Sequence, residues 1–230
     1  YNDPERTDCN LRIPLWRLVR ASTAAPIYFP PEVLHWDEND RSKSFVFVDG
    51  GVTPYNNPAF LLYRMATEPR YRLGWKTGED QLLVVSVGTG SAASVQDNVD
   101  DPERNLASNL AQLPGALMYA CAVDQDTNCR TVGRCVHGAA IDREVGDLIP
   151  RGTDGQLVPL DQDLGRAFRY ARYDAELTEA GLRALDLPDI DPGQVSKLDA
   201  VENIGDLRRI GRAVAQTVRP EHFGPFLLQR

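Results

Sequence analysis

The 230-residue sequence has little cysteine and no long apolar run. No stretch reaches the ~20 apolar residues that a membrane-spanning helix needs. Its four cysteines are too few for a disulfide framework, and we expect free thiols in a cytoplasmic compartment. Cys121, Cys129, Cys135 and His137 lie near one another in sequence, but their spacing matches no common zinc site. We therefore expect neither a metal nor a cofactor.

Basic residues are also in the minority. The chain has 25 Lys and Arg against 33 Asp and Glu, which gives a net charge of −8. This balance argues against nucleic acid as a partner, because a phosphate backbone rewards clustered cations. It also disfavours tight binding to an anionic membrane by charge alone, although an apolar rim could make transient contact with a membrane surface.

The apolar pattern predicts two buried strands joined by a helix. The run FVFV (45–48) is typical of a strand covered on both faces, and QLLVVSVGTGS (81–91) predicts a second such strand. Residues 56–68 lie between them and begin with Asn-Asn-Pro, a helix-start signal. This order favours a parallel sheet, whose carboxyl edge would hold both Asp49 and Thr89.

The remaining pattern predicts mainly helices. The expected elements are a helix over 15–25, a polar connection over 34–44, a helix over 106–132 broken near Pro114, a strand over 167–174 that could lie at the sheet edge, and a helical tail first capped by Thr178. Together they predict an α/β fold with a mostly parallel sheet covered by helices. The α/β body would cover about 1–175, and a helical C-terminal wrap about 176–230.

Two turns could carry chemistry. Asp49 follows a strand and would be held rigidly, while Gly50 and Gly51 leave room beside its carboxylate. The same residues are also compatible with an ordinary turn. The Gly-Thr-Gly turn at 88–90 could hold a phosphate in a nucleotide-binding protein, but it lacks the Lys of a P-loop, so a tight turn is favoured.

Three ordered motifs resemble one known family. RASTAAPIYFPP (20–31), FVDGGVTPYNNP (47–58) and LLVVSVGTGS (82–91) follow one another as in the C-terminal half of the catalytic domain of patatin-like phospholipases. The tail from residue 173 resembles that of bacterial members. The resemblance implies a three-layer α/β/α fold, with residues 1–230 as the C-terminal portion of a single patatin-like domain.

The resemblance also implies a lipid acyl hydrolase that cleaves carboxylic esters with a Ser-Asp dyad. Its aspartate would be Asp49, supported by Gly50 and Gly51, and its substrate a lipid or phospholipid. Tyr28 and Phe29 would line the acyl pocket. The dyad needs neither a metal nor a cofactor, and the protein would be cytoplasmic or peripheral at the membrane.

The serine of that dyad is missing from this chain. None of its eight serines lies in the Gly-x-Ser-x-Gly pattern of a nucleophile elbow. The chain also begins without Met. We therefore expect the serine on an N-terminal segment or a partner chain outside these residues, and this chain alone to be inactive. The alternative is a non-catalytic module that binds lipid or a partner protein.

Overall fold

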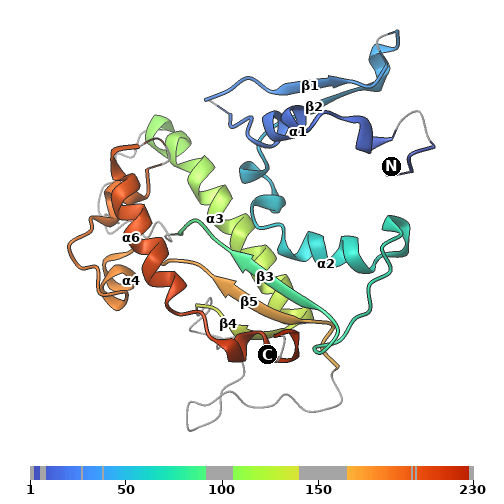
Figure 1. Ribbon diagram of the computed structural model, residues 1–230. Helices are drawn as coiled ribbons and strands as arrows, with labels where there is room; N and C mark the ends of the chain where they lie inside the picture. Colours follow the sequence, from blue (N-terminus) through green and yellow to red (C-terminus); the bar gives the residue numbers. More distant parts are fainter. Residues whose placement is uncertain are drawn as a thin grey trace. The chain divides into compact units, whose positions relative to one another are not determined.

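The computed structural model describes residues 3–5, 9–26, 28–37, 39–91, 106–139, 165–197, 199 and 201–227. These residues form two compact units, Tyr1–Asn56 and Asn57–Arg230, and each is described here by itself (Figure 1). The helices are α1 (Leu15–Ser22), α2 (Ala59–Thr67), α3 (Leu106–Val132), α4 (Glu179–Ala184), α5 (Pro192–Val195) and α6 (Ile204–Ala215). The strands are β1 (Glu32–His35), β2 (Ser44–Phe47), β3 (Leu83–Val87), β4 (Arg134–His137) and β5 (Arg169–Tyr173).

The first unit contains helix α1 and an antiparallel hairpin. Strand β2 pairs with β1, with Glu32 opposite Phe47 and His35 opposite Ser44. The prediction that the 45–48 run belongs to the parallel sheet and is buried on both faces was therefore wrong. The polar connection between the strands is short, and a short connection reverses the chain, whereas a parallel neighbour needs a long crossover. The apolar run alone does not reveal which strand it pairs with.

Helix α1 is shorter than predicted. It ends at Ser22, and the backbone N–H and the hydroxyl of Thr23 both donate to the carbonyl of Val19. The Arg17 guanidinium ties α1 to β1 by donating to the Glu32 carboxylate at 3.2 Å and to the Val33 carbonyl at 3.0 Å. These contacts fix the helix against the hairpin within the first unit.

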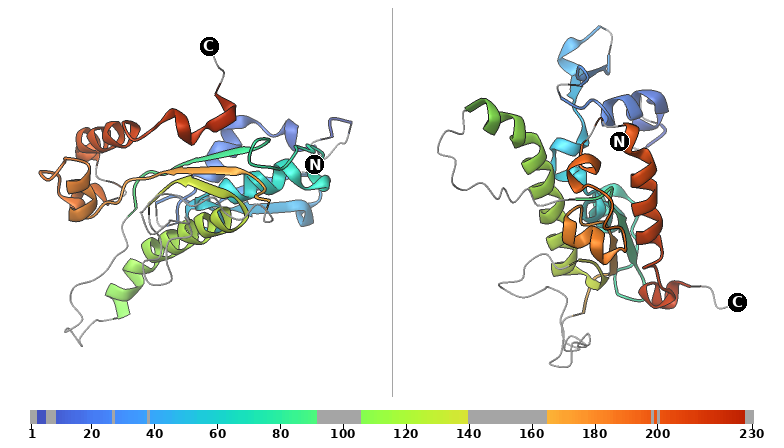
Figure 2. Two further views of the ribbon diagram at one scale, coloured as in Figure 1. Left: turned by 90° about the horizontal axis from the view of Figure 1, so that it is seen from below. Right: turned by 90° about the vertical axis from the view of Figure 1, so that its left-hand side faces the viewer.

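The second unit is built on a three-stranded parallel sheet in the order β3-β5-β4. The predicted α/β class is thus confirmed. Strand β5 occupies the centre and not the edge, because the chain passes from β3 through α3 to β4 and later inserts β5 between them. Figure 2 shows α3 on one face of the sheet and the C-terminal segment on the other.

Two hydrophobic cores hold the second unit together. In the first, helices α2 and α3 cover one face of the sheet through Ala59, Leu82, Val84, Cys129, Cys135, Phe168 and Tyr170. In the second, the helical tail packs on itself through Ala175, Leu177, Leu182, Ile190, Val195 and Ile210. The predicted helical tail is present, and the Thr178 hydroxyl caps α4 by accepting the Gly181 N–H at 3.0 Å.

Helix α3 continues through Pro114, where a break was expected. A proline inside a helix removes one backbone hydrogen bond and crowds the preceding turn. The cost is local, and the C-terminal turns of α3 are held by their packing against β4 and β5. Of the helices that the structure describes, none is long and apolar enough to span a bilayer.

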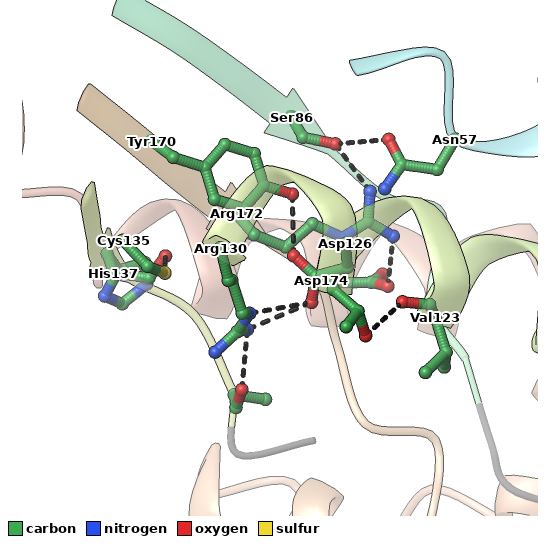
Figure 3. Close-up of polar contacts among 12 residues, drawn as sticks. Asn57, Ser86, Val123, Asp126, Arg130, Cys135, His137, Tyr170, Arg172 and Asp174 are labelled. Carbon is green, nitrogen blue, oxygen red and sulfur yellow. Dashed lines mark hydrogen bonds and ion pairs between the residues drawn. The ribbon is translucent and has the colours of Figure 1, made fainter. Parts of the chain in front are cut away.

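A buried ion pair within α3 is joined to β5 by the Tyr170 hydroxyl. The Asp126 carboxylate accepts hydrogen bonds from Arg130, four residues later in α3, at 3.0 Å and from the Tyr170 hydroxyl at 2.7 Å (Figure 3). Burial, and then the Asp126 charge, raise the pKa of Tyr170, so this hydroxyl remains a donor. Arg130 is 2% exposed and also donates to the Ala139 carbonyl. The pair is therefore shielded from water.

The first prediction tests this pair. Asp126→Asn removes the buried carboxylate charge that Arg130 and Tyr170 contact, so we expect a loss of about 3–5 kcal/mol in the free energy of unfolding. The matched control is Glu179→Gln, which breaks the exposed Glu179–Arg183 pair at the same helix spacing. Denaturant unfolding should show the control nearly unchanged. Equal stability of the two variants would contradict a structural role for the buried pair.

Two histidines attach the C-terminal segment to the sheet. The rings of His137 on β4 and His222 stack at 4.4 Å, and the Tyr173 hydroxyl lies 2.8 Å from Nδ1 of His222. Burial, and then the nearby His222 and Arg130 charges, lower the pKa of His137. Burial also lowers the pKa of His222, although the Glu221 charge opposes this change. Both rings are therefore stable in the neutral form.

The second prediction follows from these lowered pKa values. The unfolded chain, with histidine pKa values near 6.5, takes up protons more readily than the folded protein. The stabilisation is thus complete above about pH 6.5 and is lost as pH falls through the folded pKa values. We expect the thermal midpoint to fall between pH 7.5 and 5.5, with a shallower slope in His137→Gln/His222→Gln. His35→Gln, which alters an exposed histidine in the first unit, should keep the wild-type slope.

Candidate functional site

The carboxyl edge of the parallel sheet is organised around the Asp174 carboxylate. Strands β3 and β5 end level with each other, and the Gly88 N–H continues the pairing by donating to the Tyr173 carbonyl at 2.8 Å. Asp174, the residue after β5, then accepts hydrogen bonds from the Gly90 N–H at 2.8 Å and from the Ser91 hydroxyl at 3.2 Å. The Asp174 carboxylate, directly after β5, therefore holds the turn that follows β3 in place.

The two glycines of this turn are required for different reasons. A Cβ at Gly88 would lie 2.2 Å from Oδ1 of Asp174, and Gly90 has a φ of +98°, which favours glycine. The Gly90 N–H, a donor that a phosphate would need, is already bonded within the chain. The arrangement supports the interpretation of residues 88–90 as a tight turn and not as a phosphate site.

Asp174 also anchors a chain of polar contacts that reaches α2. Arg172 donates to Asp174 at 2.7 Å and to the Ser86 hydroxyl at 2.6 Å, and Ser86 in turn donates to Oδ1 of Asn57 at 3.0 Å (Figure 3). Asn57 is 1% exposed and also accepts the Ala59 N–H at the start of α2. Asn57 thus contacts the first N–H of α2, although the N-cap residue is Pro58 and no side chain bonds at that position.

Sequence reasoning missed this network. Neither Arg172 nor Asp174 was selected, because both lie in a segment that was interpreted only as a strand. The available signal was the Asp that follows a predicted parallel strand, since polar groups gather at that edge of a sheet.

Asp49 lies at the end of β2 in the first unit. Its N–H donates to the Ala24 carbonyl at 3.0 Å, which ties the residue to the segment after α1. Its carboxylate Oδ1 accepts the Gly51 N–H at 2.6 Å and caps a 3-10 turn over Gly50–Val52. The side chain is half-buried, and none of the residues that the structure describes bonds Oδ2. One carboxylate oxygen is thus fixed, and the other accepts no hydrogen bond from the described part of the chain.

Contrary to expectation, Asp49 and Thr89 do not follow strands of one sheet. The shared-edge argument assumed that both follow strands of one sheet, whereas β2 belongs to the antiparallel pair. A Cβ at Gly50 would meet nothing within 4 Å among the described residues, which give no steric reason for glycine there.

Tyr28 and Phe29 lie in the turn after α1. Their N–H groups both donate to the Ala25 carbonyl, and the Arg20 guanidinium lies 5.6 Å from the centre of the Phe29 ring. Both side chains are exposed, at 51% and 56%. Their role as acyl-pocket residues stays a prediction.

All four cysteines are free. Burial, and then the Asp126 charge, raise the pKa of Cys129 to about 12, so this thiol is not a nucleophile at neutral pH. Within the described parts of the chain, no three His, Cys, Asp or Glu side chains are placed to hold a metal ion.

The fold and these sites define an α/β protein whose parallel sheet is fastened at its carboxyl edge, with a separate aspartate in a Gly-Gly turn. Half of the chain is similar to patatins of Solanum tuberosum, and this similarity supports a relationship to the patatin-like family. Patatin-2-Kuras 4 is 32% identical over 121 residues, which cover 50% of this chain and 30% of that protein. Patatin-2-Kuras 1 and Patatin-15 are each 30% identical over the same length.

The chain thus spans about 30% of the length of these relatives. No family model matches the chain, and no solved structure matches it significantly.

The third prediction tests the turn around Asp174. Gly88→Ala forces a methyl group onto the Asp174 carboxylate, so we expect a loss of about 1–3 kcal/mol in the free energy of unfolding. Gly211→Ala is the control: its Cβ would meet nothing within 4 Å in helix α6, where alanine is the better helix former. Urea unfolding should separate the two variants. A Gly88→Ala protein as stable as Gly211→Ala would contradict the close approach.

Proposed function

We propose that this chain is part of a patatin-like lipid acyl hydrolase that cleaves carboxylic esters of lipids, with phospholipids as the favoured substrates. The similarity of half the chain to patatins carries this proposal. The motif order around Asp49 supports it, because the aspartate, the Asn-Pro helix start and the Gly-Thr-Gly turn follow one another as in that family.

Asp49 acts as the general base of a Ser-Asp dyad in this proposal. A serine in a Gly-x-Ser-x-Gly segment, upstream of residue 1 or on a partner chain, supplies the nucleophile. The geometry of Asp49 suits the role, because the Gly51 N–H holds Oδ1 and leaves Oδ2 to take a proton. Gly50 and Gly51 support the motif by their place directly after Asp49, where the Gly51 N–H is the donor to its carboxylate.

The reaction then proceeds in two steps, formation of an acyl-serine and its hydrolysis. Asp49 removes the serine proton as the serine oxygen attacks the ester carbonyl, and the developing oxyanion is met by backbone N–H donors outside this chain. Asp49 returns the proton to the departing alcohol, which leaves an acyl-serine. Water then attacks the acyl-serine as Asp49 takes its proton, and Asp49 returns that proton to the serine oxygen as the acyl–serine bond breaks and the fatty acid is released.

The proposed substrate also determines where we expect the protein to act and what it contacts. The protein acts in the cytoplasm and reaches its substrate by transient contact with a membrane surface. Tyr28 and Phe29, which are exposed in the first unit, contact the acyl chain. The missing nucleophile favours one alternative: a non-catalytic patatin-like module that binds lipid or a partner protein.

The fourth prediction tests Asp49 in the complete protein. Asp49→Asn keeps the shape of the side chain but removes the base, so we expect ester hydrolysis to fall by about 10²–10⁴-fold. Turnover of phospholipid vesicles measures this loss, and the unfolding midpoint should remain within a few degrees of wild type.

Asp40→Asn is the matched control, because Asp40 also caps a 3-10 turn by accepting a backbone N–H two residues ahead. It should retain full activity. Unchanged hydrolysis in Asp49→Asn would overturn the dyad assignment. Absence of hydrolysis in a complete wild-type protein that still binds lipid would favour the non-catalytic module.

A further inference from the structure

The segment after α6 lies on the face of the sheet opposite α3 (Figure 2). We call residues 218–227 the C-terminal strap. In the described parts of the chain, its backbone hydrogen bonds join only neighbouring residues, as in the turns over Pro220–His222 and Gly224–Phe226. Neither of the two hydrophobic cores described above includes a residue of the strap. Its attachment to the sheet therefore depends on individual side chains.

His222 joins the strap to the sheet. Its ring stacks on that of His137, with 4.4 Å between the ring centres and 20° between the planes. Its Nδ1 lies 2.8 Å from the Tyr173 hydroxyl. His137 and Tyr173 belong to β4 and β5, which are neighbours in the sheet. One imidazole thus connects the strap to two strands.

The hydrogen bonds of His222 require a neutral ring. The backbone N–H of Arg219 donates to Nδ1 at 3.4 Å, and this bond caps the turn over Pro220–His222. Because a backbone N–H only donates, Nδ1 is an acceptor and the ring carries its proton on Nε2. The Tyr173 hydroxyl then donates to the same Nδ1. A second proton on Nδ1 would remove the cap and force the Tyr173 hydroxyl to turn and accept.

A protonated His222 would also meet cations on the sheet side. Charges on both stacked rings would repel each other across 4.4 Å. Arg130 of α3 adds a positive charge near His137. The Arg169 guanidinium of β5 lies against the strap, since a Cβ at Gly224 would be 2.8 Å from its Cζ. Protonation therefore replaces attachment by repulsion.

The carboxylates near the histidine pair do not offset this repulsion. Asp126 and Asp174 are each already paired with an arginine of α3 or β5. Glu221 would attract the protonated ring and Arg219 would repel it. Both belong to the strap and move with it, so their effects persist after release and do not hold the strap to the sheet.

We propose that the C-terminal strap is an acid-sensitive switch: protonation of His222 releases residues 218–227 from the sheet while the rest of the second unit stays folded. Release uncovers the rings of His137 and Tyr173 at the carboxyl end of β5, directly before Asp174. The proposal does not depend on the proposed hydrolase. It also differs from the loss of global stability predicted above, because the release is local and precedes unfolding.

Hydrogen exchange of the protein, measured by mass spectrometry, tests the release. After correction for the intrinsic pH dependence of exchange, the strap should lose protection by about tenfold between pH 7.5 and 5.5. This is the change expected when a group with a pKa near 6.5 takes up its proton only in the released form. The amides of β5 and α6 should keep their protection. Equal losses in the strap and β5 would indicate global unfolding and overturn the proposal.

His222→Asn separates the imidazole from other effects of acid. The asparagine amide places an acceptor near the position of Nδ1 and does not titrate. Protection of its strap, whatever the level, should not change with pH. The matched control His35→Asn removes an exposed histidine of the first unit, and its strap should respond like wild type. The proposal is overturned if the His222→Asn strap still loses protection in acid, or if the wild-type strap does not.

Discussion

The hydrogen-bonded Asp174 carboxylate is the contact on which the second unit depends. It joins the turn after β3 to the end of β5, and through Arg172 and Ser86 it reaches Asn57 at the start of α2. A partly buried carboxylate is stable only when its lost hydration is replaced by donors. Gly90 and Arg172 are among those donors. Gly88 follows from this requirement, because a Cβ there would lie on the carboxylate, whereas a Cβ at Gly90 would meet the Leu177 side chain.

The hydrogen bonds of Asp174 leave little room for chemistry at the carboxyl edge of the sheet. The carboxylate at the sheet edge has its hydrogen-bonding capacity taken up within the chain, so Asp174 is a structural acid. Asp49 differs, because Oδ1 is held by the Gly51 N–H while Oδ2 has no bond among the residues that the structure describes. Two acids that both follow strands thus differ in their hydrogen bonds, and of the two only Asp49 has a carboxylate oxygen that no described residue bonds.

Local signals predicted most elements, although the break expected at Pro114 is absent and α1 is shorter than expected, and non-local pairing was beyond them. The limits of α3 and the Thr178 cap were correct because helix period and capping depend on nearby residues. Strand β2 was assigned to the wrong sheet, and β5 to a possible edge, because an apolar run does not specify which strands it pairs with. Asp174 was missed for the same reason: its donors lie more than 80 positions earlier in the chain, at Gly90 and Ser91.

The central functional claim is that Asp49 serves a serine outside these 230 residues. The most direct measurement is to treat the native protein from its source with a phosphonate that modifies activated serines, and to sequence the modified peptide. The account predicts a single modified serine within Gly-x-Ser-x-Gly that is none of the eight serines of this chain. Modification of one of those eight, or no modification of a native protein that hydrolyses lipid esters, would contradict it.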